Sequence, residues 1–108
     1  GLNHLIRPMI YDAYHHILNL SNPSGAVKPY MVTGYICETD TFAEDRPLPE
    51  IKEGDILCIL NAGAYGFEMS SHYNARFKPA ELLVENKEMK LIRRRETLED
   101  LLNTQIES

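Results

Sequence analysis

Apolar and β-branched residues occur in short runs separated by turn-forming residues, a pattern typical of strands. Residues 30–37 are rich in Tyr, Val, Ile and Thr, which favour strands. The continuous apolar run at residues 56–60 has the length of a strand and predicts one that is buried on both faces. Residues 80–84 and 89–92 flank an Asn-Lys pair at positions 86–87, which predicts a hairpin.

Helical patterns are found near the two ends of the sequence. Residues 7–20 are ambiguous, because their first half fits a short helix whereas residues 15–20 alternate like a strand. Thr97 followed by Asp100 matches a capping box, in which both side chains accept hydrogen bonds from free N–H groups. The apolar residues that follow fall on one helical face: Leu98, Leu101, Leu102 and Ile106. We therefore expect a mainly β domain, a barrel or sandwich, with one short N-terminal helical turn and a C-terminal helix.

Clusters of Pro, Gly, Asn and Ser interrupt these elements. Residues 22–25 (Asn-Pro-Ser-Gly) predict a turn. Residues 46–49 (Arg-Pro-Leu-Pro) cannot lie inside a helix, because each Pro lacks an N–H, and they are interpreted as a break. Residues 62–66 (Ala-Gly-Ala-Tyr-Gly) predict a loop of small residues around Tyr65. Such a loop lets the backbone approach a ligand closely, or forms a tight corner in which Tyr65 packs.

Length and charge exclude several classes of protein. The chain has 108 residues, with 11 Lys and Arg against 16 Asp and Glu and a net charge of −5, which fits one domain. The acidic balance argues against a nucleic-acid binder, which needs clustered basic residues. No apolar run approaches the roughly 18 residues of a membrane span. Cys37 and Cys58 do not form a disulfide framework, so a reducing cytoplasm is the expected location.

Cys37 and Glu38 are adjacent at the end of a predicted strand. An exposed thiol there would serve as an acid or a nucleophile, and the neighbouring carboxylate disfavours the thiolate, which favours a proton donor. The residue types alone favour the other interpretation, in which Cys37 is a small buried hydrophobe. Cys58 lies inside an apolar run and is interpreted in the same way.

Arg7 and Tyr11 provide a second candidate for binding. Arg7 can hold a carboxylate through two N–H groups, with the Tyr11 hydroxyl as a third donor; an exposed Arg that solvates a turn is equally consistent with the residue type. Residues 69–74 form a polar stretch that would line the same site as Tyr65 in the loop at residues 62–66. His15 and His16 point to opposite faces if they lie on a strand, and without partners at ligand spacing we expect no metal site.

The order of these motifs resembles the C-terminal β domain of diaminopimelate decarboxylases. Five stretches of the sequence carry the resemblance: residues 1–15 around Arg7-Pro8-Met9-Ile10-Tyr11, residues 34–39 (Gly-Tyr-Ile-Cys-Glu-Thr), Gly54-Asp55 with residues 62–66, residues 69–76, and residues 93–97 (Arg-Arg-Arg-Glu-Thr). The likeness extends over nearly the whole chain. The stretch Cys37-Glu38-Thr39-Asp40 is one residue shorter than in typical members, which leaves the role of Asp40 open, and Tyr35 replaces their Pro.

The resemblance implies a bacterial pyridoxal 5'-phosphate enzyme that converts meso-2,6-diaminopimelate to L-lysine and carbon dioxide in lysine biosynthesis. Its architecture is related to that of alanine racemase and ornithine decarboxylase, and its sites lie at a homodimer interface. Cys37, the expected acid, and Glu38, for the distal ammonium of the substrate, would reach into the partner's site. Arg7 and Tyr11, for the distal carboxylate, and Tyr65, for substrate and cofactor, would serve the site of their own chain.

No residue matches the family's cofactor lysine. We therefore expect residues 1–108 to be a single C-terminal β domain, a fragment that lacks the N-terminal α/β barrel and is inactive alone. Two alternatives stay open: the same domain of a sister decarboxylase acting on carboxynorspermidine, arginine or ornithine, and a free-standing β interaction module. Glu38 beside Cys37 and the spacing of Arg7 and Tyr11 argue against the sister enzymes. A severed domain would expose more apolar surface than a free-standing module.

Overall fold

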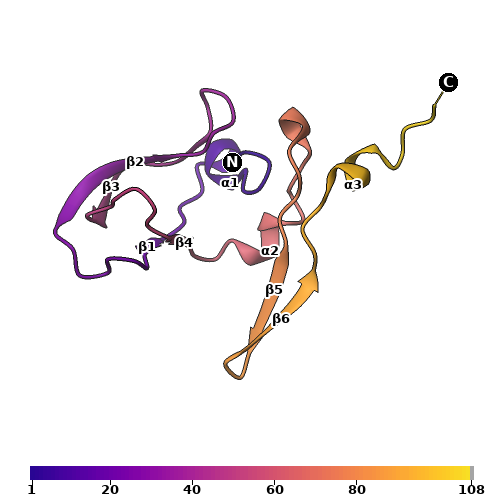
Figure 1. Cartoon of the computed structure of the whole chain (residues 1–108). Coiled ribbons are helices and arrows are strands. Elements are labelled where there is room, and N and C mark those ends of the chain that lie inside the picture. The colour runs from indigo at the N-terminus through magenta and orange to yellow at the C-terminus, as the bar shows by residue number, and fades with distance from the viewer. Residues whose placement is uncertain (108) are drawn as a thin grey trace.

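Three antiparallel pairs of strands form the framework of the chain, with short helical segments between and after them (Figure 1). The computed structural model describes residues 1–107. The strand pairs are β1 with β4, β2 with β3, and β5 with β6. In chain order the elements are α1 (Arg7–Tyr11), β1 (Ile17–Asn19), β2 (Val27–Thr33), β3 (Thr41–Pro49), β4 (Leu57–Ile59), α2 (Gly63–Gly66), the 3₁₀ turn η1 (Tyr73–Ala75), β5 (Glu81–Glu85), β6 (Glu88–Arg93) and α3 (Leu98–Leu102).

The expectation of a break at residues 46–49 is wrong, because β3 continues through Pro47 to Pro49. The register explains how a strand accommodates these prolines. Pro47 lies opposite Pro29 and Pro49 lies opposite Val27, so both occupy the same alternate set of positions. In an antiparallel ladder every second pair directs its N–H groups away from the partner strand, and a residue without an N–H costs nothing there.

A small apolar core lies where β1, β3 and β4 meet. Ile17, Ala43 and Leu48 are buried there, and Leu57 and Ile59 of β4 pack against them. Burial of β4 on both faces is not observed, since its three residues are only partly buried and the preceding Ile56 is 64% exposed. Among the described strands β4 pairs with β1 alone, and the small core covers its side chains only in part.

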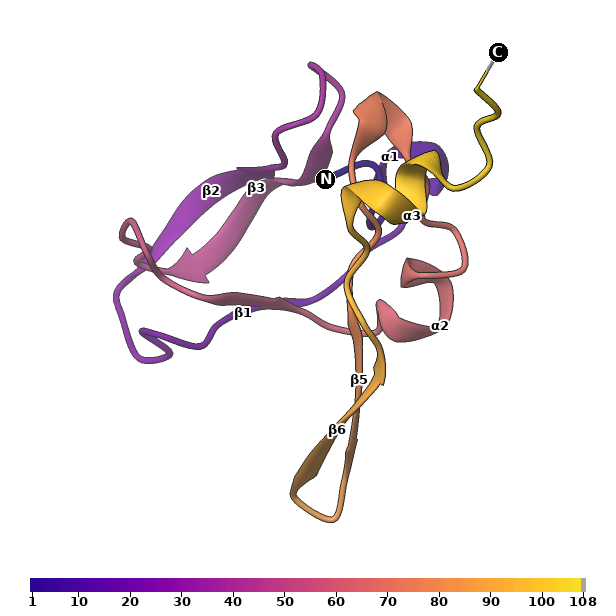
Figure 2. The ribbon, with the colours of Figure 1, turned by 45° about the vertical axis from the view of Figure 1, so that its right-hand side comes forward.

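The predicted hairpin at Asn86 and Lys87 is confirmed. β5 and β6 pair up to Glu85 and Glu88, and the two turn residues have φ angles of 51° and 65°, as a two-residue hairpin loop requires. The hairpin projects away from the other two sheets as a long twisted ribbon (Figures 1 and 2). Every residue of β6 is exposed, and within residues 1–107 the ribbon is covered only at its base, where Arg93 lies over the Phe67 ring.

The expected helical segments at both ends are confirmed, with one difference in length. Residues 7–20 divide into α1 and β1. The capping box of Thr97 and Asp100 opens α3, but the helix ends at Leu102. Ile106, expected on the same helical face, lies beyond the helix and is 94% exposed. The mainly β class is likewise confirmed, while closure into a barrel or sandwich stays a prediction.

Residues 62–66 also differ from expectation, because Gly63–Gly66 forms the short helix α2 rather than an irregular loop. His15 is buried and His16 is exposed, as expected for opposite faces. Within residues 1–107, none of the helices is long and apolar enough to cross a membrane. Over the same residues, His, Cys, Asp and Glu side chains do not gather in groups that could hold a metal ion.

Candidate functional site

Cys37 and Glu38 lie on the loop that joins β2 to β3. Both side chains are exposed, so the interpretation of Cys37 as a small buried hydrophobe is wrong. Cys37 has a φ angle of 54°, a left-handed conformation that non-glycine residues adopt only when neighbouring contacts hold them there. Ile36, directly before it, is 1% exposed. The loop thus exposes the side chains of Cys37 and Glu38 directly after the buried Ile36.

The thiol of Cys37 contacts two residues of a distant turn. Its sulfur lies 3.6 Å from the Tyr73 hydroxyl and 3.6 Å from the Asn74 side-chain nitrogen. The hydrogen bond between the Tyr73 hydroxyl and the Cys37 sulfur raises the pKa of Tyr73, because the contact favours the protonated phenol. The sequence indicated a polar stretch at residues 69–74, but nothing local in it indicated that Tyr73 and Asn74 meet Cys37.

Arg7 and Tyr65 form a second group. The guanidinium carbon of Arg7 lies 4.8 Å from the centre of the Tyr65 ring, which brings α1 and α2 together through a cation–π contact. The Nε atom of Arg7 is buried and has no hydrogen-bond partner among the described residues. Tyr11 is 62% exposed, and no hydrogen bond between the described residues joins it to Arg7. Buried donors are normally paired, so this one stands out among the polar atoms of the described residues.

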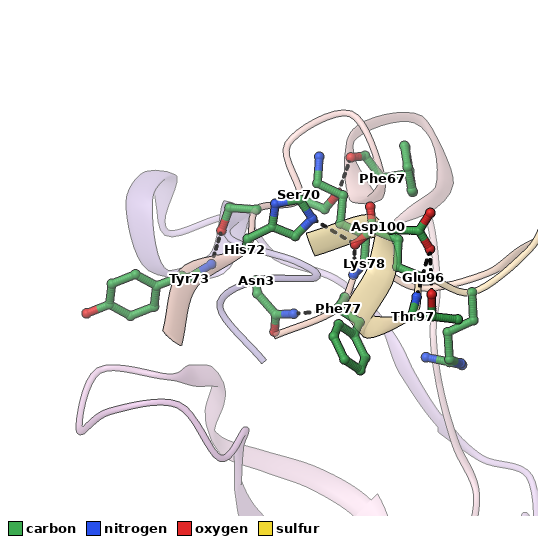
Figure 3. A network of polar contacts seen from close by, with 12 residues as sticks. Asn3, Phe67, Ser70, His72, Tyr73, Phe77, Lys78, Glu96, Thr97 and Asp100 are labelled. Atoms are coloured by element: carbon green, nitrogen blue, oxygen red, sulfur yellow. Dashed lines mark hydrogen bonds and ion pairs between the residues drawn. The ribbon is translucent and has the colours of Figure 1, made fainter. Parts of the chain in front are cut away.

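A polar network holds the turn that contacts Cys37 (Figure 3). The Oε2 atom of Glu96 accepts hydrogen bonds from the Lys78 backbone N–H at 2.8 Å and from His72 Nε2 at 2.7 Å. These contacts, the Lys78 N–H first among them, lower the pKa of Glu96. Sequence patterns did not identify Glu96, because both partners lie about twenty residues before it along the chain.

Asn3 connects the first residues of the chain to the turn that carries Tyr73. It is fully buried, and its side-chain nitrogen donates to the Phe77 carbonyl at 3.3 Å (Figure 3). Its backbone carbonyl accepts a hydrogen bond from the Ser71 N–H at 3.0 Å. The Ser71 hydroxyl in turn accepts from the Tyr73 N–H at 3.3 Å. The position of Tyr73 therefore depends on contacts that begin at Asn3.

The predicted site residues do not enclose one cavity. A groove of about 540 Å³ lies between the end of α1 and the start of β3, lined among others by Asp12, Tyr14, Glu44 and Arg46. Neither Cys37 and Glu38 nor Arg7 and Tyr65 line it. Across the described residues, no hydrogen bond or ion pair joins the first pair to the second. The chain presents two separate polar surfaces, each open on its outer side.

Comparison with known proteins places the chain in a family. A model of the C-terminal sheet domain of pyridoxal-dependent decarboxylases matches residues 1–63. The chain belongs to this family. Its curated relatives include the diaminopimelate decarboxylase of Methanothermobacter thermautotrophicus, 52% identical over 107 residues, and that of Aquifex aeolicus, 47% identical over 108 residues.

Solved structures agree with the sequence comparison. A crystal structure of diaminopimelate decarboxylase from M. jannaschii matches all of this chain with a TM-score of 0.92 and 40% identity. The same enzyme in complex with L-lysine matches with a TM-score of 0.90 and 38% identity. The alignment with the M. thermautotrophicus relative includes 97% of this chain but 25% of the relative. The alignments with the two solved structures likewise include 25% of those chains. The chain thus spans about a quarter of the length of the proteins it matches.

Proposed function

We propose that this chain is the C-terminal domain of a diaminopimelate decarboxylase, a cytoplasmic enzyme that converts meso-2,6-diaminopimelate to L-lysine and carbon dioxide. The observation that carries the proposal is the 52% identity with the M. thermautotrophicus diaminopimelate decarboxylase over 97% of the chain. The complete enzyme also needs the N-terminal α/β barrel that carries the cofactor lysine. Residues 1–108 alone are predicted to be inactive.

Arg7 and Glu38 are suited to the two charges at the distal end of this substrate. The guanidinium of Arg7, whose Nε atom is buried without a partner among the described residues, provides a fork of N–H donors for the distal carboxylate, with the exposed Tyr11 hydroxyl as a further donor. The exposed carboxylate of Glu38 provides an acceptor for the distal ammonium. A substrate that lacks the distal carboxylate would leave Arg7 unpartnered, which is how polar sites discriminate between related ligands.

Pyridoxal 5'-phosphate, when bound, supplies the electron sink for loss of carbon dioxide. Tyr65 is the residue of this chain that fits the cofactor: it is 54% exposed and holds its ring against Arg7, so its hydroxyl is free to donate to a phosphate oxygen. Cys37 would hold a proton at its sulfur and deliver it to the substrate carbon from which carbon dioxide has left. Exposure of the thiol and its contact with Tyr73 support this role.

A homodimer accounts for the separation of the two polar surfaces. Cys37 and Glu38 would enter the site of the partner subunit, while Arg7, Tyr11 and Tyr65 serve their own. The extent of uncovered apolar surface supports burial against other polypeptide: on the β5–β6 ribbon alone, Leu82, Val84, Met89, Leu91 and Ile92 are each more than half exposed. Monomeric proteins rarely leave contiguous apolar surface of this kind bare, which argues against a free-standing module.

The test uses the complete protein that contains this chain, with its cofactor. Lysine and carbon dioxide are measured with meso-2,6-diaminopimelate, and then with arginine, ornithine or carboxynorspermidine as competitors. We expect lysine formation that these competitors, which lack the distal amino-acid end, inhibit weakly. Efficient turnover of a competitor, with no lysine formed from diaminopimelate, would instead assign the chain to a sister decarboxylase.

A further inference from the structure

Asp40 closes the loop that carries Cys37 and Glu38. Its side chain is 2% exposed, although an aspartate rarely lies so deep without a structural reason. Its Oδ2 atom accepts a hydrogen bond from the Ile36 N–H at 2.9 Å, and its backbone carbonyl accepts one from the Gly34 N–H at 2.7 Å. The two bonds tie the end of the loop to its beginning.

Gly34 and Asp40 are fitted to each other. A Cβ atom added to Gly34 would lie 2.0 Å from Asp40 Oδ2 and 2.5 Å from its Cγ, far inside any allowed contact. Any side chain at position 34 would therefore displace the carboxylate from the Ile36 N–H. Gly34 is required here for the space it leaves and not for its backbone angles, since its φ lies outside the left-handed region.

These contacts have a direct consequence for Cys37. The left-handed backbone of Cys37 lies between buried Ile36 on one side and buried Asp40 three residues later. The left-handed conformation is unfavourable for residues other than glycine, so Cys37 keeps it only where its flanks are fixed. The hydrogen bond from Ile36 to Asp40 spans Cys37 and Glu38 and fixes both flanks at once.

We propose that Asp40 is a positioning residue that holds the Cys37 thiol and the Glu38 carboxylate in the geometry the reaction needs. This inference rests on the proposed function. Asp40 touches neither substrate nor cofactor; it acts through the backbone of Ile36 and the fit against Gly34. The resemblance left the role of Asp40 open, because the stretch after Cys37 is one residue shorter than in typical members. In this loop the Asp40 carboxylate still accepts the hydrogen bond from the Ile36 N–H.

The test is a double-mutant cycle in the complete holoenzyme. We expect Asp40→Ala to lower kcat for lysine formation at least about 10-fold, because a displacement of about 1 Å in a reacting group costs up to about 100-fold. In a Cys37→Ala background the same change should lower kcat much less, since the thiol that delivers the proton is then absent and only Glu38, which binds the distal ammonium, is left to position. Asp40→Asn, which keeps an acceptor oxygen for the Ile36 N–H, should retain activity within about threefold.

Gly34→Ala provides an independent route to the same result. It leaves Asp40 in the sequence but displaces its carboxylate, and should lower kcat as Asp40→Ala does; combined with Asp40→Ala, it should add little. Glu53→Ala, at an exposed glutamate far from the loop, is the matched control. Should Asp40→Ala fail to fold, kcat of the other two variants tests the inference: it should fall in Gly34→Ala and stay within about threefold of normal in Asp40→Asn.

Two results would overturn the inference while the unaltered enzyme forms lysine. One is normal kcat in both Asp40→Ala and Gly34→Ala although Cys37→Ala is impaired. The other is an equal loss from Asp40→Ala with and without Cys37, which would show a general structural role. Absence of lysine formation by the unaltered enzyme would instead contradict the proposed function itself.

Discussion

The hydroxyl of Tyr73 lies 3.6 Å from the sulfur of Cys37, across 36 residues of sequence. Because this contact favours the neutral phenol, it raises the pKa of Tyr73. The stabilisation it provides is present below the unfolded-state pKa of tyrosine and is lost as the pH rises through the folded-state value. The thiol of one loop thus acts on the protonation of a phenol that lies on a distant turn.

Cys37→Ala should lower the pKa of Tyr73 toward its ordinary value. The measurement is the ultraviolet titration of phenolate in the complete enzyme, with Tyr73→Phe used to assign the signal by its loss. Cys58→Ala is the matched control, since Cys58 lies on β4 and has no contact with Tyr73 among the described residues. An unchanged Tyr73 titration in Cys37→Ala would show that the contact does not persist in the assembled protein.

Arg7→Lys should impair substrate binding more than chemistry. Lysine keeps the positive charge but loses the planar fork and the stack on Tyr65, so we expect KM for meso-2,6-diaminopimelate to rise by about 10- to 100-fold, the effect of losing about 1–3 kcal/mol from a charged hydrogen bond. Tyr65→Phe, which keeps the ring under Arg7, should leave this KM nearly unchanged and weaken cofactor binding. Steady-state kinetics measures the KM for the substrate, and titration with the cofactor measures its binding. A normal KM in Arg7→Lys would exclude Arg7 from the substrate site.

Glu96→Ala should loosen the turn that holds Tyr73. Loss of the acceptor for the Lys78 N–H costs about 1 kcal/mol, so exchange of that amide hydrogen should become about fivefold faster. Because the folded-state pKa of Glu96 is lowered, its contribution is present above the ordinary glutamate pKa and is lost as the pH falls through the folded-state value. Glu68→Ala, at an exposed glutamate, is the control, and equal exchange in both variants would refute the role of Glu96.

Lys87→Gly should stabilise the β5–β6 ribbon. Lys87 has a φ angle of 65°, and glycine adopts that angle without the cost that a side chain imposes, a gain of about 1 kcal/mol. Lys90→Gly, in the middle of β6, should have the opposite effect, because glycine weakens a strand interior. Amide hydrogen exchange across β5 and β6 measures both, and faster exchange in Lys87→Gly would contradict the turn geometry.

Features with local causes could be predicted from the sequence. The hairpin turn at Asn86 and Lys87 depends on two adjacent residues that tolerate positive φ. The start of α3 depends on Thr97 and Asp100, which lie one helical turn apart. Both were confirmed, because the physical cause of each lies within a few residues.

Features that depend on distant partners could not be predicted. β3 accommodates Pro47 because the register with β2 places it at a position whose N–H would point away from the partner strand, and a local rule about proline does not contain that register. The burial of Asp40 depends on the space left by Gly34, and the contacts of the Cys37 thiol depend on the turn at Tyr73. The sequence indicated Cys37, Glu38, Arg7 and Tyr65 by resemblance, while the residues that hold them emerged only from the fold.

Subunit complementation tests most directly whether Cys37 serves the partner's site while Arg7 serves its own. Complete enzymes carrying Cys37→Ala and Arg7→Ala, each nearly inactive, are dissociated, mixed in equal amounts and reassembled. With random pairing half of the dimers are mixed, and one of the two sites in each mixed dimer has both residues intact, so about a quarter of full activity should return. Recovery of no activity, although mixed dimers form, would contradict the account, because it would place Cys37 and Arg7 in the site of the same subunit.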